Sequence, residues 1–155
     1  MTARIEKAVL SGVFSLDGQD FDVDNNVWLV GDDDEVLVID APHRSEPIVE
    51  AIGGRRVTAI VLTHGHNDHI TAAVALREAT GAPIWINPAD LMLWERVHPG
   101  ALPDHPVGAT GRSYSDEPTI LNSIRSCLLT LPGDTVVRTG HGDDTTIAAE
   151  MCCVR

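Results

Sequence analysis

The sequence predicts an α/β fold, and two observations carry that prediction. Strand-like apolar runs dominate the first forty residues. Further along, apolar runs of strand length, such as VTAIVL at 57–62, alternate with stretches of helical periodicity. Such alternation of strands with helices is typical of α/β architecture. The chain has 155 residues, 43% of them hydrophobic and 22% charged, which predicts one globular domain over residues 1–155.

The first third of the chain is expected to be β-structure joined by polar turns. Residues 9–16 form a short apolar stretch, and the strand-like runs VWLV at 27–30 and VLVI at 36–39 follow it. The acidic segment 17–26 is predicted to be a solvated turn region. The polar segment 31–35 is predicted to connect the two later strands as a hairpin.

The middle of the chain is predicted to alternate between helix and strand. A short helix over 47–52 precedes the apolar run at 57–62, whose unbroken hydrophobicity indicates a strand buried on both faces. Beyond a polar loop, we expect a helix over 70–80, a short strand over 83–86 and a helix over 89–97. A proline and a glycine directly after residue 98 stop the last of these helices.

The last third of the chain contains an unusually long predicted loop. Residues 98–118 include four prolines and three glycines, and a loop of this length is uncommon in a compact domain unless it is functional or disordered. After it we expect an amphipathic helix over 119–129, a strand over 135–139 and the start of a last helix over 143–150.

The charge balance excludes two classes of partner. The net charge of −12 argues against nucleic acid and against anionic membranes, because both select for Lys and Arg. No apolar run approaches the roughly 20 residues that a membrane-spanning helix needs. The N-terminus lacks the pattern of a signal peptide, so we expect a cytoplasmic location. Cys127, Cys152 and Cys153 lack the spacing of a disulfide framework and are expected to be reduced thiols.

The segment THGHNDH, directly after the buried strand, carries the strongest chemical signal. His64 and His66 are two positions apart, so in an extended loop they point the same way, and Gly65 between them permits unusual backbone angles. Asp68 and His69 follow as the chain enters a helix, so they can face a second point in space. Imidazole and carboxylate ligands suit zinc, iron or manganese. One loop could thus supply two ligands to each of two ions, which is a common arrangement for hydrolysis.

These residues carry a family resemblance. HGHNDH resembles the HxHxDH signature of the metallo-β-lactamase superfamily, and VIDAP at 38–42 resembles that family's strand ending in an aspartate beneath the metal loop. TGHG at 139–142 is similar to the family's last ligand motif. ATGRSY at 109–114 resembles the glycine–arginine–aromatic stretch of the glyoxalase II-like branch. The resemblance extends over about residues 8–150.

The resemblance implies a set of metal ligands. His64 and His66 would bind a first ion, while Asp68, His69 and His141 would bind a second. Asp68 would also have a catalytic role, because it would help to orient the nucleophilic hydroxide. The implied cofactor is zinc, as one or two ions, with iron and manganese as alternatives.

The resemblance also implies a fold, a reaction and further site residues. The fold would be an αββα sandwich. The protein would be a metal-dependent hydrolase that cleaves a small-molecule thioester or similar acyl compound with a hydroxide held by the metal. Asp40 would accept a hydrogen bond that fixes a ligand. Arg112 and Tyr114 would hold substrate, although Arg112 is equally compatible with a plain surface position and packing is the favoured role for Tyr114.

The sequence departs from the family pattern at two ligands. A third histidine for the first ion and an aspartate that bridges both ions are expected between the helix at 89–97 and the glycine–arginine–aromatic stretch. Instead, an internal gap near residues 106–108 shortens the chain, and the second sheet should lack strands. The first ion would keep two ligands, whereas a catalytic zinc usually has three. His98 or His105 could substitute as a ligand.

Three functions remain open on these grounds. The leading one is the thioester hydrolase, binding one metal equivalent at most and turning over weakly or not at all. The second is a non-catalytic, metal-binding remnant of the family, which the missing ligands favour. The third is an iron-dependent sulfur oxidoreductase. A sandwich that lacks strands exposes apolar surface and sheet edges, so we expect a chain of marginal stability or a homodimer.

Overall fold

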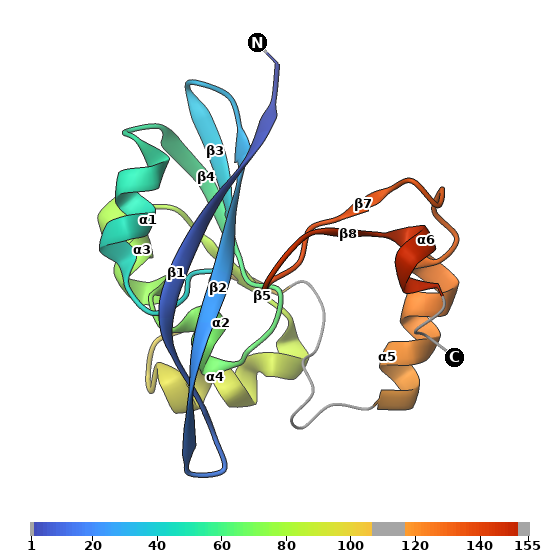
Figure 1. The fold of residues 1–155 in the computed structure, drawn as a ribbon. Coiled ribbons are helices and arrows are strands. Elements are labelled where there is room, and N and C mark those ends of the chain that lie inside the picture. Colours follow the sequence, from blue (N-terminus) through green and yellow to red (C-terminus); the bar gives the residue numbers. More distant parts are fainter. Residues whose placement is uncertain (1, 107–116, 152–155) are drawn as a thin grey trace. The chain divides into compact units, whose positions relative to one another are not determined.

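A computed structural model describes residues 2–106 and 117–151 (Figure 1). The chain divides into two compact units, Met1–Thr110 and Gly111–Arg155. The predicted substrate residues Arg112 and Tyr114 lie outside the described residues, as do Cys152 and Cys153.

The first unit is built on one six-stranded mixed sheet, in which the strands lie in the order β1-β2-β3-β4-β5-β6. The first three strands pair antiparallel, and β3 to β6 pair parallel. The carboxyl ends of parallel strands therefore meet at one edge of the sheet. The strands are β1 (Arg4–Leu16), β2 (Gln19–Gly31), β3 (Glu35–Ile39), β4 (Arg56–Val61), β5 (Ile84–Ile86) and β6 (His105–Pro106).

The β1–β2 hairpin differs from the expectation for this segment. Only Asp17 and Gly18 form the turn, with φ angles of 51° and 78°, and the ladder resumes at Gln19. The expected turn region at 17–26 is therefore wrong. Its acidic residues occupy alternate positions of β2, so they share one face of the strand while the intervening residues lie on the other. The Asp-Gly pair is a strong hairpin signal that accounts for the difference.

Helices follow the parallel strands of the first unit, as the periodicity predicts. The helix expected at 47–52, which is α1 in the structure, ends at Gly53 in a left-handed conformation with φ of 65°. Its residues Ile48 and Ile52 are buried in the same hydrophobic core as Leu76 of α3. The helices are α1 (Ser45–Ile52), α2 (Asn67–Ile70), α3 (Ala73–Thr80) and α4 (Leu91–Val97), with the 3₁₀ turn η1 (Pro88–Asp90) before α4.

The second unit contains little regular structure besides one helical stretch and a short ribbon. The predicted helix at 119–129 is α5 (Glu117–Ser123) continued by the π-helical turn η2 (Ile124–Leu128). A two-stranded sheet pairs β7 (Val136–Val137) with β8 (Thr145–Thr146), and α6 (Ile147–Glu150) follows. The last helix begins later than expected because the two threonines before it pair with β7. Within the described residues, the second sheet is thus reduced to two strands, as the shortened sequence predicts.

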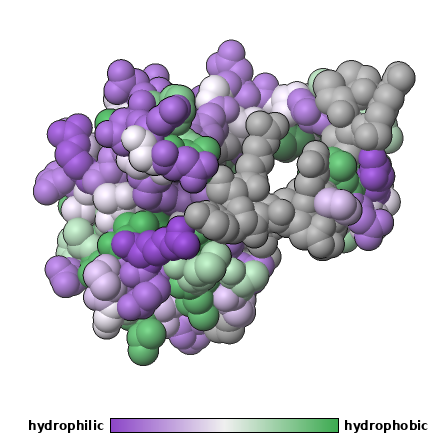
Figure 2. Space-filling model, turned by 90° about the horizontal axis from the view of Figure 1, so that it is seen from below, coloured by the Kyte–Doolittle hydropathy of each residue, from purple (hydrophilic) through white to green (hydrophobic). Residues whose placement is uncertain are grey.

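Surface hydrophobic residues are numerous in the first unit. Figure 2 shows hydrophobic residues interspersed with hydrophilic ones on the face seen from below. Ile5, Val9 and Val13 are spaced four residues apart in β1, so they share one face of the strand. These three residues are 42–56% exposed. No helix within residues 2–106 and 117–151 is both long enough and apolar enough to cross a bilayer. The expected homodimer stays a prediction.

Candidate metal centre

The candidate centre lies where β3 and β4 end, at the carboxyl edge of the parallel strands. Asp40 follows β3, and the THGHNDH loop follows β4. Two backbone hydrogen bonds clamp these segments together: the Ala41 amide donates to the His69 carbonyl, and the Ala72 amide donates to the Ala41 carbonyl, both at 2.9 Å. Asp40 has a φ of 64°, which is unusual for a residue other than glycine. Such conformations concentrate at functional sites, where the surrounding structure over-determines them.

Asp40, Asp68 and His69 form a buried cluster, each at most 3% exposed. Asp40 Oδ2 lies 2.8 Å from His69 Nδ1. A carboxylate on Nδ1 places the proton there and leaves Nε2 as the atom that can bind a metal. His69 Nε2 in turn lies 3.5 Å from Asp68 Oδ2. Two ligands at about 2.1 Å from one tetrahedral ion are about 3.4 Å apart, so this pair fits a shared zinc.

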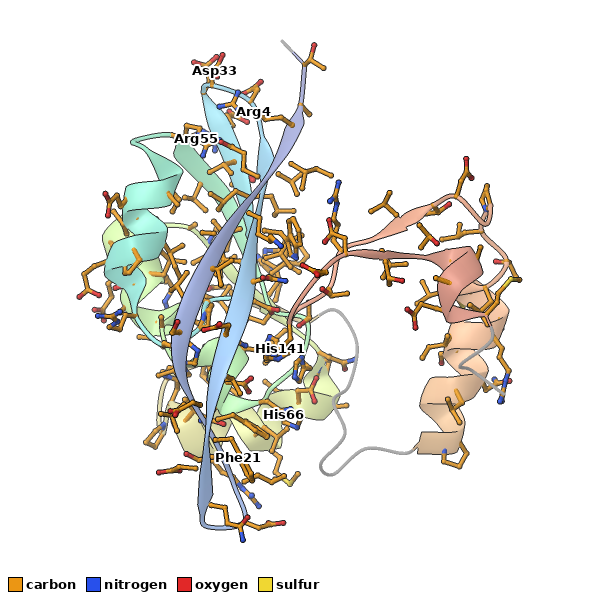
Figure 3. The ribbon with its side chains drawn as sticks, in the orientation of Figure 1. Arg4, Phe21, Asp33, Arg55, His66 and His141 are labelled. Carbon is orange, nitrogen blue, oxygen red and sulfur yellow. The ribbon has the colours of Figure 1, made fainter. Side chains whose placement is uncertain are left out.

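His64 and His66 form a second pair of candidate ligands, on the preceding part of the loop. His64 Nε2 and His66 Nδ1 are 3.1 Å apart, a separation that also suits two ligands of one ion. Thr63 Oγ1 lies 3.0 Å from His64 Nδ1, and Thr63 also donates through its amide and its hydroxyl to the Asp40 carboxylate. His66 packs against Phe14 at 5.3 Å between ring centroids, in the half of the hairpin where Phe21 lies (Figure 3). The His64 ring is therefore held by Thr63, and the His66 ring is held by Phe14.

The electrostatic surroundings shift the pKa values of His64 and His69 in opposite directions. Burial, together with the neighbouring His69 ring, lowers the pKa of His64 to about 4, so this imidazole is neutral at pH 7 and available as a ligand. Burial alone would also lower the pKa of His69. The hydrogen bond that His69 donates to Asp40 and the charges of Asp40 and Asp68 outweigh that effect, and the pKa of His69 is raised.

Close packing around the loop explains its glycine. A Cβ added to Gly65 would lie 2.9 Å from Leu93 Cβ, closer than real Cβ contacts occur, and a tight 3.0 Å from Asp90 Cβ. Asp90 itself is 3% exposed. Burial raises the pKa of its carboxyl to about 6. Gly65, between the two predicted ligands His64 and His66, thus packs closely against the end of η1 and the first turn of α4.

Two residues that the sequence reasoning missed complete this cluster. Asn25 of β2 is wholly buried, and its Nδ2 lies 3.1 Å from Asp68 Oδ2 and 3.3 Å from His69 Nε2. Its Oδ1 lies 2.9 Å from His43 Nε2. No motif marks Asn25, and it is 43 positions from Asp68 in the sequence. The sequence places Asn25 in the expected turn region 17–26, where a polar residue is solvated, so it gives no signal of a buried role; burial in β2 is what requires partners for this polar group.

The remaining predicted residues belong to other segments of the chain. His141 belongs to the second unit, in the exposed segment between β7 and β8. His98 Nε2 lies 2.8 Å from the Ile70 carbonyl oxygen, and the ring of His105 packs on Trp85 at 4.2 Å. Within residues 2–106 and 117–151, neither His98 nor His105 belongs to a group of three or more metal-ligating side chains. The ligand roles of the five predicted residues stay predictions.

Comparison with known proteins identifies relatives of this chain. A 107-residue stretch is 45% identical to an uncharacterized 11.5 kDa protein of Rhodococcus erythropolis, covering 69% of this chain and 84% of that protein. A hydroxyacylglutathione hydrolase of Cereibacter sphaeroides is 31% identical over 172 residues, covering 84% of this chain and 67% of the hydrolase. That aligned span exceeds the length of this chain, so the hydrolase carries residues within it that this chain lacks.

The structural comparison agrees with the sequence comparison. The crystal structure of the B3 metallo-β-lactamase BLEG-1 superposes with a TM-score of 0.71 at 21% sequence identity, covering 92% of this chain and 97% of the lactamase. At that identity the likeness shows a shared fold. The family described as the metallo-beta-lactamase superfamily matches residues 21–146, which include the hairpin, the THGHNDH loop and His141. The chain therefore belongs to the metallo-β-lactamase superfamily.

Proposed function

We propose that this protein is a metal-dependent hydrolase acting on a thioester or a similar acyl compound. The observation that carries the proposal is the buried Asp40–His69–Asp68 cluster at the carboxyl edge of the sheet. Two of its atoms, His69 Nε2 and Asp68 Oδ2, have the separation of ligands to one ion. The family binds divalent metal ions, and a relative bears the name hydroxyacylglutathione hydrolase. A hydroxyacylglutathione thioester is thus the first substrate to try.

The chain's own residues would prepare the site in a defined way. A divalent ion supplies two things when bound: it lowers the pKa of water and polarises a carbonyl. Asp40 holds the proton of His69 on Nδ1, so Nε2 stays a ligand. Burial keeps His64 neutral, so this ring needs no deprotonation before it binds. Asp68 would add the negative charge that partly balances the cation and would orient the attacking hydroxide.

The proposed occupancy is one ion, held by Asp68, His69 and His141. The first two contribute from the first unit, and the family resemblance assigns His141. Three protein ligands with one open position are the usual arrangement of a catalytic zinc. His64 and His66 alone would supply two ligands to a first ion, which predicts weak binding there. Zinc is the proposed metal, and iron and manganese suit the same ligands.

A non-catalytic metal-binding protein is the second candidate. The shortened chain favours it, because the hydrolase relative carries residues within the aligned span that are absent here. The family's third histidine and bridging aspartate are expected in that part of the sequence. An iron-dependent sulfur oxidoreductase would need the same two residues and is the least favoured of the three.

The test is hydrolysis of a hydroxyacylglutathione thioester by the zinc-loaded 155-residue chain. The loss of thioester absorbance measures the rate. We expect slow, zinc-dependent turnover in the wild type. His69→Ala should reduce the rate to that of the buffer, whereas His105→Ala, whose ring packs on Trp85, should retain it. Equal rates for wild type and His69→Ala would overturn the hydrolase proposal.

The metal content separates the alternatives. A zinc-binding wild type without any zinc-dependent turnover would favour the non-catalytic candidate. A chain purified with iron, and inactive on the thioester with zinc, would favour the oxidoreductase. Elemental analysis of the protein purified without added metal, together with the thioester assay, distinguishes these outcomes.

A further inference from the structure

We propose that Asn25 is a positioning residue for the metal centre, and that His43 holds its amide in the working orientation. The inference rests on the proposed ion site at Asp68 and His69. It assigns a function to a buried asparagine of β2 and to a histidine that the sequence left without a role. Both residues lie in the first unit, together with the two ligands that they would support.

The contacts of Asn25 determine which way its amide points. Its Oδ1 is 2.9 Å from His43 Nε2, and an amide oxygen only accepts hydrogen bonds. His43 must therefore carry its proton on Nε2 and donate it to Asn25. The amide nitrogen, which only donates, then faces Asp68 Oδ2 at 3.1 Å.

The alternative orientation of the amide would be unfavourable. A flipped Asn25 would place its oxygen against the Asp68 carboxylate, which is repulsive, and its NH₂ would face His43 Nε2, so His43 would have to move its proton to Nδ1 to accept it. Asp68 is 3% exposed, and a buried carboxylate requires hydrogen-bond donors to offset its lost hydration. With its proton on Nε2, His43 thus supports the amide orientation that stabilises Asp68 in its ligand position.

The backbone around His43 supports the same role. His43 has a φ of 52°, which few residues other than glycine adopt. Its ring lies over Gly12 of β1, where an added Cβ would be 2.2 Å from His43 Nδ1. Gly12 therefore leaves the space that the His43 ring occupies beside Asn25. A side chain at residue 12 would displace the ring.

Zinc affinity, measured by competition with a chromophoric chelator, tests the proposal without relying on activity. Asn25→Leu keeps the branched shape of the side chain, although with a larger volume, and removes its polar contacts with Asp68, His69 and His43. We expect its affinity for zinc to fall about 10–100-fold, the usual effect of losing a residue that orients a ligand. The matched control is Asn26→Leu, which changes an equally buried asparagine on the opposite face of β2 and should leave the affinity within about twofold of wild type.

Variants of His43 separate positioning from general damage to the fold. His43→Gln retains an N–H donor at the reach of Nε2 and should stay within about threefold of wild type, whereas His43→Ala should weaken zinc binding about tenfold. Gly12→Ala should reproduce the effect of His43→Ala. The absorption spectrum of the Co²⁺-loaded protein should shift in His43→Ala and return to the wild-type spectrum in His43→Gln.

The outcomes distinguish this inference from the function on which it rests. A wild-type chain that binds no zinc would remove the proposed ion site itself. A wild type that binds zinc, with Asn25→Leu and His43→Ala binding equally well, would overturn the positioning role alone. If Asn25→Leu fails to fold, the comparison of His43→Ala with His43→Gln decides, and equal affinities in that pair would contradict the proposal.

Discussion

The two units of the chain differ in how much buried structure they contain. Within residues 2–106 and 117–151, every buried hydrophobic residue belongs to the first unit except Ile147. The first unit also buries the polar residues Asn25, Asp40, Asp68 and His69, which hydrogen bonds link to one another. In the second unit, the predicted ligand His141 is exposed. The comparison indicates that the first unit organises its own residues of the candidate metal centre from its sheet and loops.

The largest expected effect is a difference between the two units in how much a leucine-to-alanine substitution lowers the free energy of unfolding. Leu76 of α3 is wholly buried in the core of the first unit, whereas Leu131 is 43% exposed in the second. We expect Leu76→Ala to lower the free energy of unfolding by about 2–5 kcal/mol, and Leu131→Ala by less than about 1 kcal/mol. Urea denaturation followed by circular dichroism measures both. Equal losses in the two variants would contradict the division of the core.

Much of the first unit is predictable because its signals are local. The unbroken apolar run at 57–62 and the periodic segments that follow it identify β4, α3 and α4 to within a few residues. The acidic residues after Asp17 indicate a turn by their composition, whereas in the structure they alternate on one face of β2. A strand with one solvated face carries charge without ceasing to be a strand.

The candidate site was predictable only where a motif marks it. HGHNDH is compact in the sequence, and the strand before Asp40 ends at the same sheet edge as β4. Asn25 and His43 were missed, because neither belongs to a motif and the contact between Asn25 and Asp68 joins residues 43 positions apart. Contacts of this kind depend on the packing of α2 against β2, which the local sequence patterns do not specify.

A second prediction compares the ligands from the two units. His141→Ala should weaken zinc binding about 100-fold or more, because the proposed ion would lose one of three protein ligands. The control is His98→Ala, whose ring is engaged with the Ile70 carbonyl. Equilibrium dialysis against buffered zinc measures both. Unchanged affinity in His141→Ala would show that the second unit contributes no ligand.

A third prediction concerns Asp40 and the tautomer of His69. Asp40→Asn tolerates the positive φ of this position, since asparagine is favoured there. Its NH₂ can face His69 Nδ1, which would move the histidine proton to Nε2 and block that atom. Zinc affinity should fall about 10–100-fold. The control is the exposed Asp34→Asn, and a loss of similar size in that variant would refute the explanation.

The smallest expected effect is a pH dependence of the free energy of unfolding, caused by Asp90. Because burial raises the pKa of Asp90 from 3.8 to about 6, the folded protein binds a proton that the unfolded chain has released between these values. The contribution of Asp90 to stability is therefore present below about pH 4 and is lost as the pH rises through 6. Asp90→Asn should remove this dependence. Urea denaturation of both metal-free proteins between pH 4 and 7 measures it, and parallel pH profiles would contradict it.

Zinc titration of the 155-residue chain tests the central claim most directly. The claim is that the buried residues around Asp68 and His69 hold one divalent ion. We expect one tight equivalent in the wild type and none in a variant carrying both Asp68→Asn and His69→Gln, with both proteins folded by circular dichroism. Two tight equivalents in the wild type, or one tight equivalent that persists in the double variant, would contradict the account.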